Sequence, residues 1–130
     1  MALTQDRKTA RRSGHDFSFP MKAGTIYAGA LVVMDAGLAM PGFIDNKVTA
    51  VGVAKEGNSC SVDGEQLIKV EKGFHRFNNS AGGEMITLAD VGREAWIIDD
   101  ETVAKGDGAG ARSPAGIIAD VDEFGVWIKF

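Results

Sequence analysis

The residues best suited to chemistry lie in the stretch IIDDETVAKGDGAGARSPAG, residues 97–116, where acidic side chains and glycines are crowded together. A calcium loop of the EF-hand type needs oxygen ligands at alternate positions, a glycine at the sixth position and a glutamate at the twelfth. Counting from Asp99 puts Val103 and Ala104 at the fifth and sixth positions, and counting from Asp107 puts alanine at the third and fifth positions, where ligands should be. The stretch is therefore not an EF-hand-type calcium loop.

A phosphate-binding loop is the second alternative, because GDGAGA at 106–111 has the G-x-G-x-x-G/A spacing. That motif binds an anion only when a helix follows, since the amides and the dipole at the helix start hold the charge. Here Pro114 follows closely and favours extended geometry at Ser113, so no helix can begin. We therefore predict a strand, a wide turn and a second strand over 97–116, with the acidic residues 99–101 in a solvated turn.

The remaining candidates for catalysis are one cysteine and two histidines. Cys60 lies in the polar segment EGNSCSVDG, and a thiol nucleophile needs a histidine partner to lower its pKa. His15 lies in or near the predicted arm and His75 in a strand pattern, which argues against a Cys–His pair. The two histidines are also sixty residues apart, which argues against a zinc site. The sequence therefore predicts a protein that is not an enzyme and has no cofactor and no metal.

Length and composition are those of one soluble domain. The chain has 130 residues, and its single cysteine excludes an intrachain disulfide. Its 17 glycines point to many tight turns. No apolar run approaches the roughly 20 residues that span a bilayer, and the polar N-terminus is unlike a signal peptide. We expect a protein made in the cytoplasm, without a membrane partner.

The charge is unevenly distributed along the chain. Residues 1–22 carry five basic and two acidic side chains, whereas the rest has a net charge of −7. Between Ala2 and Gly14 the only large apolar residue is Leu3, so this part cannot fold on its own. We predict a flexible basic N-terminal arm at 1–22 and a folded domain at 23–130.

Past the arm the pattern is typical of an all-β protein. Short runs rich in Val, Ile, Phe and Trp alternate with Gly, Pro, Asn and Asp, at 17–19, 29–35, 50–56, 66–78, 95–100, 115–122 and 125–130. This favours a compact β-barrel-like single domain. Gly73 interrupts the longest run and predicts a bulge, or a bend that lets one long strand serve two sides of a barrel. Only TLADVG at 87–92 resembles a helix start, so we expect at most one short helical turn.

The last run, GVWIKF, is apolar on both faces of a strand. Val126, Ile128 and Phe130 alternate with Trp127 along this segment. We expect one face to be buried and Trp127 to contact a partner subunit, the alternative being that both faces belong to the core.

Several segments in a fixed order resemble the head decoration, or capsid cement, proteins of tailed bacteriophages and prophages. They are KAGTIYAGALVVMDAGLAMPG, KVEKGFHRFNNS, ITLADVGREA, and the closing stretch from AWIIDDETVAK to GVWIKF. The arm MALTQDRKTARRSG is also similar to the arm of these proteins. The resemblance covers most of the chain.

The resemblance implies a structural virion protein on the outer surface of the expanded capsid, which it stabilises by binding the major capsid protein. It also implies a homo-oligomer, with a trimer favoured. We expect the arm to contact the shell through Leu3, Thr4, Arg7, Arg11 and Arg12.

Nucleic-acid binding by the basic arm is the alternative function. Four basic residues within six positions can contact phosphates. The chain is nevertheless acidic overall, with a net charge of −4, and the arm has no aromatic residue on which a base could stack. We therefore expect no nucleic-acid partner.

Overall fold

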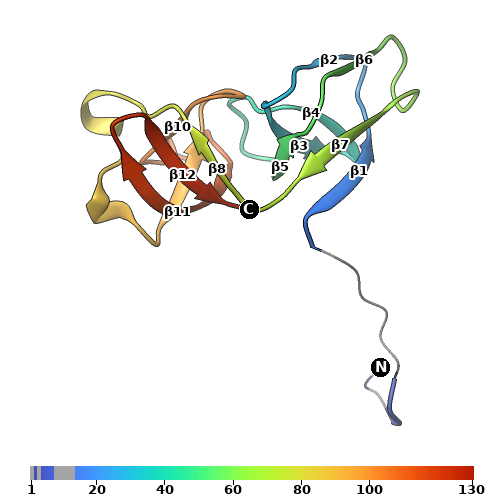
Figure 1. The fold of residues 1–130 in the computed structure, drawn as a ribbon, viewed down its shortest axis with the longest axis horizontal. Coiled ribbons are helices and arrows are strands. Elements are labelled where there is room, and N and C mark those ends of the chain that lie inside the picture. The colour runs from blue at the N-terminus through green and yellow to red at the C-terminus, as the bar shows by residue number, and fades with distance from the viewer. Residues whose placement is uncertain (1, 3, 8–13) are drawn as a thin grey trace.

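The chain folds into short antiparallel strands arranged as two barrels side by side (Figure 1). The computed structural model describes residues 2, 4–7 and 14–130, and within this part of the chain the only helical elements are two 3₁₀ turns. The expected all-β domain is thus confirmed. None of the helices found in the described residues is long and apolar enough to cross a membrane.

The first barrel contains a five-stranded sheet with the order β1-β7-β5-β3-β4. An isolated bridge from Met21, just after β1, to Ala39 in β4 joins the two edges of the sheet, which gives it a barrel-like shape. The separate pair β2–β6 forms a small ribbon beside it. The strands of this half are β1 (Asp16–Pro20), β2 (Gly24–Ile26), β3 (Leu31–Asp35), β4 (Leu38–Pro41), β5 (Thr49–Ala54), β6 (Asn58–Cys60) and β7 (Leu67–Glu71).

The second barrel has the order β10-β9-β11-β12-β8, and a bridge from Asn78 to Thr102 joins its edges in the same way. Two 3₁₀ turns lie between its first two strands. Its elements are β8 (Phe74–Phe77), η1 (Gly82–Glu84), η2 (Leu88–Asp90), β9 (Glu94–Ile97), β10 (Val103–Ala104), β11 (Pro114–Asp122) and β12 (Gly125–Lys129).

The two barrels have the same connectivity and register. When the ribbon strands β2 and β6 are left out, each half has five strands. Their order across the sheet is β1-β7-β5-β3-β4 in the first barrel, and read from the other edge it is β8-β12-β11-β9-β10 in the second. In both barrels this is the first, fifth, fourth, second and third strand along the chain. In the first barrel Ser18 pairs with Lys69, and in the second Arg76 pairs with Trp127. The paired strand positions of one half therefore have counterparts in the other, although the sequence shows no obvious repeat.

A glycine at a β-bulge occupies equivalent places in the two barrels. Gly52 in β5 and Gly116 in β11 each follow one residue that is skipped in the pairing with the neighbouring strand. A methyl group on Gly52 would lie 2.5 Å from the carbonyl oxygen of Glu71, and one on Gly116 would lie 2.5 Å from that of Lys129. The close approach of two strands thus requires glycine at both bulges.

Two clusters of buried side chains fill the molecule. One fills the first barrel beneath the ribbon, with Met21, Ile26, Ala30, Val32, Ala39, Val51, Ala54, Ile68 and Val70. The larger cluster combines the interior of the second barrel with Leu31, Val33, Val48 and Val53 from the first. Because this cluster is shared, the two barrels form one domain.

The chain crosses between the barrels once among its described residues, at Lys72 and Gly73. Gly73 has a φ of 111°, and β7 before it and β8 after it belong to different sheets. A bend is therefore present at Gly73, but it connects two strands of two barrels, so the expectation of one long strand on two sides of one barrel is wrong.

Polar contacts also hold the two barrels together. The buried Ser113 Oγ donates to the carbonyl oxygen of Asp45 at 2.6 Å and accepts from the N–H of Val48 at 3.2 Å.

Two details differ from the sequence-based expectation. β1 lies within the range 1–22 that was predicted as arm, because Phe19 packs on the first core and β1 pairs with β7; the body begins at Asp16. The turn expected at TLADVG is present as η2, where the carboxylate of Asp90 accepts the N–H of Thr87 at 2.9 Å. A second turn, η1, was not predicted.

Candidate interaction surface

Of the five arm residues expected to bind the shell, the structure describes two. Thr4 and Arg7 are exposed. Leu3, Arg11 and Arg12 lie outside the described residues. The role of the arm therefore stays a prediction.

Trp127, the residue expected at a subunit interface, lies on the outer face of β12. Its neighbours Val126 and Ile128 are fully buried in the shared core, whereas Trp127 is half-buried on the opposite face. The indole N–H of Trp127 donates to Asp122 Oδ2 at 3.0 Å. Trp127 is thus outside the core and held in one orientation on the surface.

Two residues that sequence reasoning missed lie beside Trp127. The guanidinium carbon of Arg76, on the paired strand β8, is 5.7 Å from the Trp127 ring centre and 5.4 Å from that of Phe124. A guanidinium at this distance from an aromatic face is attracted to it by about 0.5–1 kcal/mol where the site is exposed. Arg76 therefore links the β11–β12 turn to β8.

Asp122 organises the turn that carries Phe124. Its Oδ1 accepts the backbone N–H of Phe124 at 2.8 Å and that of Gly125 at 3.1 Å, while Oδ2 accepts from the indole of Trp127. The indole donor, followed by the Phe124 amide, holds the pKa of Asp122 below its ordinary value, because these bonds favour the ionised carboxylate. A single ionised side chain thus positions both aromatic rings.

We call the surface formed by Phe74, Arg76, Phe124 and Trp127 the aromatic patch. Phe74 is 59% exposed and Phe124 is 66% exposed. Phe74 and Arg76 share the outer face of β8 because they are two residues apart on one strand. The sequence signal for this patch was weak, since only the pairing of β8 with β12 brings GFHRF and EFGVW together.

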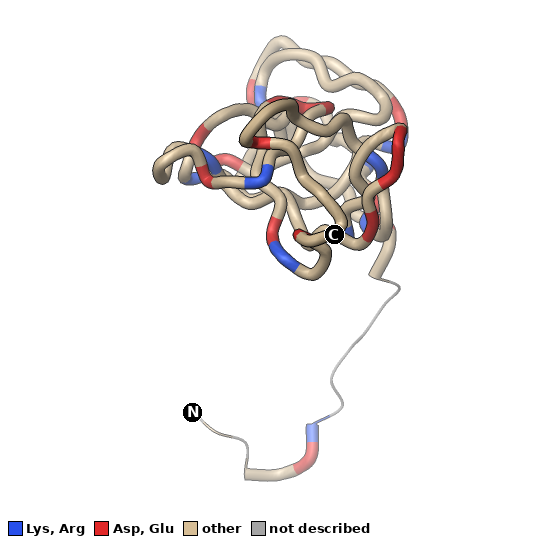
Figure 2. Tube along the Cα trace, turned by 90° about the vertical axis from the view of Figure 1, so that its left-hand side faces the viewer, with Lys and Arg blue, Asp and Glu red and all other residues tan. Residues whose placement is uncertain are grey.

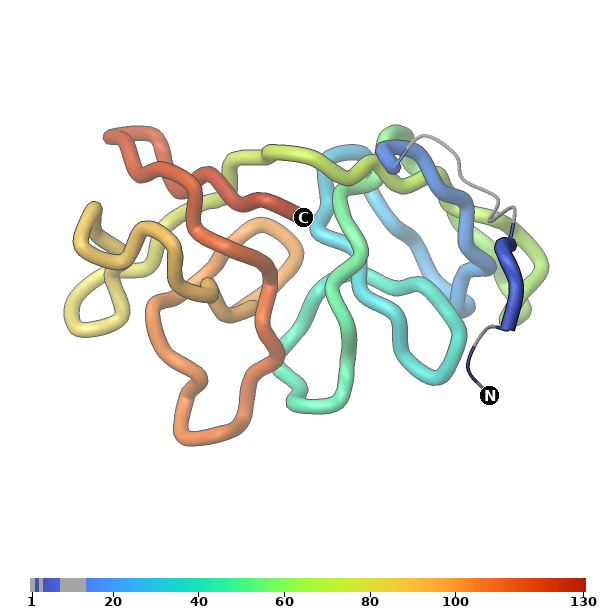
Figure 3. The backbone as a smooth tube through the Cα atoms, turned by 90° about the horizontal axis from the view of Figure 1, so that it is seen from below, coloured from blue at the N-terminus to red at the C-terminus, as the bar shows by residue number. Residues whose placement is uncertain are grey.

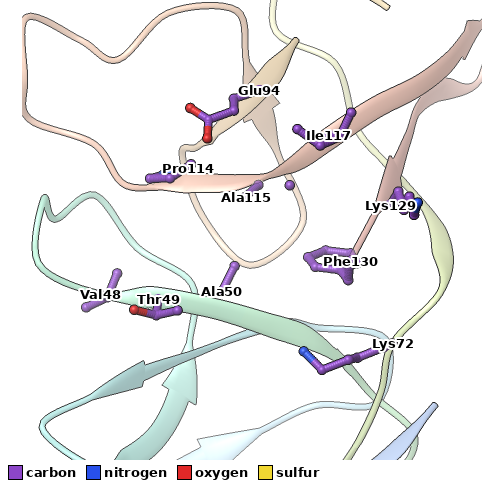
Figure 4. A pocket seen from close by; sticks show the side chains of 11 residues that line it. Val48, Thr49, Ala50, Lys72, Glu94, Pro114, Ala115, Ile117, Lys129 and Phe130 are labelled. Carbon is purple, nitrogen blue, oxygen red and sulfur yellow. The ribbon is translucent and has the colours of Figure 1, made fainter. Parts of the chain in front are cut away.

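A cleft of about 350 Å³ lies between the barrels (Figure 4). Val48, Thr49 and Ala50 form one wall, and Pro114 and Ala115 form the other. Charged side chains border it as well, and they are those of Lys72, Glu94 and Lys129. The figure shows Phe130 between the two walls.

The stretch 97–116 runs from the end of β9 to the start of β11, as predicted, but β10 divides the single wide turn that was expected into two turns. In the first, Glu101 donates its N–H to Asp99 Oδ1 at 2.9 Å. Arg112 closes the wider glycine-rich turn by donating to the carbonyl oxygen of Gly106 at 2.8 Å and to Glu84 at 2.9 Å. These contacts fold the loop back on itself and onto η1.

Two of the three residues considered for catalysis, Cys60 and His75, are engaged with the backbone. The Cys60 thiol donates to the carbonyl oxygen of Lys22 at 3.6 Å, in the ribbon of the first barrel. His75 Nε2, in the second barrel, is 3.3 Å from the carbonyl oxygen of Lys72. Among the described residues, His, Cys, Asp and Glu side chains do not form a group of three or more that could hold a metal ion.

Comparison of the chain with family models, with curated proteins and with solved structures gives no match.

Proposed function

We propose that this protein is a structural component of a tailed-phage virion that binds the outer surface of the expanded head and stabilises it. Its partner is the major capsid protein, and it acts by binding rather than by catalysis. The resemblance of the ordered segments to capsid cement proteins is the starting point of this proposal.

The observation that carries the proposal is the division of the chain at Asp16. The all-β body begins there, and the segment before it carries four basic residues and one acidic residue, while the rest of the chain has a net charge of −7. Figure 2 shows acidic and basic residues interspersed along the barrels. A basic segment that precedes the barrels in the sequence can cover a large surface of a partner, for example by adding a strand to a sheet edge.

Preorganised surface groups on the body also support a binding role. The aromatic patch combines aromatic residues with an arginine, a composition enriched at the centres of protein interfaces. A cement protein needs contacts both with the shell and with its neighbours, and a trimer at local threefold positions provides both.

The test is co-sedimentation of the protein with expanded heads of the phage that encodes it, with unexpanded heads as the comparison. We expect saturable binding to expanded heads and a higher temperature at which these heads release their DNA. Deletion of residues 2–14 should abolish most of the binding and leave the melting of the body unchanged, because β1 and all core residues remain. Arg7→Ala, Arg11→Ala and Arg12→Ala combined should weaken binding less, and mainly at low salt.

The same variants separate this function from nucleic-acid binding. A DNA-binding arm predicts retardation of duplex DNA with an affinity that falls steeply as salt rises. DNA retardation together with no binding to expanded heads would replace the cement function by the alternative. Unchanged head binding by the deletion variant would show that the arm has no part in attachment.

A further inference from the structure

Because the two barrels have the same strand order and register, the aromatic patch of the second barrel can be compared with the equivalent positions on the first. By register, Phe74 corresponds to Asp16, Arg76 to Ser18, Trp127 to Lys69 and Lys129 to Glu71. The first barrel thus folds with a polar outer face at these positions. That face is arranged as ion pairs, with Lys55 3.3 Å from Asp16 and Lys69 3.5 Å from Glu56.

The comparison shows that the barrel does not need aromatic residues on this face. Exposed aromatic side chains leave apolar surface in water, which is unfavourable by roughly 25 cal/mol per Å². The rings are also held in place, by Asp122 and by Arg76, before any partner arrives. Both features are those of a binding surface.

A complementary surface is present at the other end of the molecule. Val62, in the connection between β6 and β7, is 59% exposed, and Leu67, the first residue of β7, is 58% exposed. The carboxylates of Asp63 and Glu65 lie between them in the sequence. We call these four residues the acidic turn. The turn is fixed to the first barrel, because Asp63 accepts the N–H of Ala23 at 2.8 Å and Gly64 donates to Met21 at 2.7 Å.

The chemistry of the two surfaces matches. The aromatic patch has apolar rings beside the exposed cation of Arg76. The Asp122 carboxylate next to them is occupied by the Trp127 indole and two backbone amides, and Glu123 of the same turn is exposed to solvent. The acidic turn has apolar side chains around two carboxylates that can approach Arg76. The β6–β7 connection and the β11–β12 turn lie at opposite ends of the molecule (Figure 1, Figure 3). One chain therefore cannot bring its own two surfaces together.

We propose that the aromatic patch of one copy binds the acidic turn of a second copy. Because the two surfaces differ, the contact is head-to-tail, and it closes into a ring where the rotation between copies allows. The proposal deepens the self-association expected above by naming both surfaces. It is tested without heads, so its failure and the failure of head binding are distinguishable.

The test is sedimentation velocity of the full chain over a range of concentrations, in low and in high salt. We expect concentration-dependent association that weakens in high salt. Arg76→Glu and the pair Asp63→Lys with Glu65→Lys should each weaken association at least about tenfold, since opposed interface charges are typically worth more than 1.4 kcal/mol. Combining all three substitutions should restore association. Lys69→Ala, at the place in the first barrel that corresponds to Trp127, is the matched control and should change nothing.

Mixing two defective variants gives the decisive result. Phe124→Ser removes an exposed ring from the patch and leaves the acidic turn intact, while Asp63→Lys with Glu65→Lys does the reverse. Each variant should be monomeric alone, and the mixture should form a one-to-one dimer that grows no further. A wild-type chain that stays monomeric at every concentration, a mixture that does not dimerise, or normal association of the acidic-turn variant would each overturn the proposal. Circular dichroism melting of every variant ensures that loss of association is not loss of fold.

Discussion

Replacing the two bulge glycines by alanine tests whether the barrels are built on the same close strand approach. In Gly116→Ala the new methyl group would lie 2.5 Å from the carbonyl oxygen of Lys129 and 2.7 Å from Ile128 Cγ2. The nearest of these atoms is backbone in the adjacent strand, so the contact cannot be relieved by turning a side chain. Overpacking of this kind costs about 1–3 kcal/mol.

Gly52→Ala should be more destabilising than Gly116→Ala. Its methyl group meets the carbonyl oxygen of Glu71 at 2.5 Å, and Gly52 also has a φ of 141°. In a residue with a side chain, this backbone conformation lowers the free energy of unfolding by about 1–3 kcal/mol, in addition to the overpacking. The expected losses of unfolding free energy are therefore about 2 kcal/mol for Gly116→Ala and about 4 kcal/mol for Gly52→Ala.

Calorimetry and chemical denaturation measure these losses. For a chain of this length, 1 kcal/mol corresponds to roughly 4 °C in Tm, so Gly116→Ala should melt about 8 °C below the wild type. Gly83→Ala is the control, because a methyl group there meets nothing within 4 Å. Because the core is shared, both variants should still unfold in one transition. A Gly116→Ala protein that melts within about 1 °C of the wild type would refute the equivalence of the two bulges.

Two further predictions concern polar groups of the second barrel. Ser113→Ala leaves the buried N–H of Val48 without its acceptor and should lower the unfolding free energy by about 1–3 kcal/mol, measured in urea; an unchanged midpoint would mean that water replaces the hydroxyl. For Asp122 the pKa in the folded state is lowered, so its contribution to stability is present above its ordinary pKa of 3.8 and is lost as pH falls through the folded value. Asp122→Asn should therefore lower the free energy of unfolding at neutral pH. Below pH 3.8 the variant should lose less of its free energy of unfolding than the wild type does, which acid denaturation curves at matched temperature measure.

Local patterns in the sequence predicted the strands that are rich in large apolar residues, but not the short strands β2, β4, β6 and β10 and not the pairing of any strand. Gly73 marked the bend, TLADVG marked a turn, and Pro114 excluded a helix after the glycine-rich loop, because each of these effects depends on a few adjacent residues. The duplication of the barrel was not predicted, since it is defined by pairing between distant strands. The equivalent bulges share only a glycine, Gly52 or Gly116, between two apolar residues, which is too little to reveal a repeat.

The same limit applies to the candidate site. Trp127 could be singled out because it stands in an apolar strand, yet its position outside the core became clear only from the alternation with Val126 and Ile128. Arg76 and Phe124 were missed, because the pairing of β8 with β12 and the turn held by Asp122 bring them to Trp127. A surface made from three segments has no signature in any one of them.

The two barrels differ in how their cores are completed and in how much aromatic surface they expose. The first barrel fills its own interior and covers it with the β2–β6 ribbon, whereas the core of the second includes Leu31 and Val53 from the first. The place that corresponds to Val53 in the second barrel is taken by Ile117, which is 42% exposed. The first barrel is thus the support on which the second completes its core, and the second carries the larger share of exposed aromatic surface. This arrangement explains how one barrel plan can supply both a stable base and a surface suited to a partner.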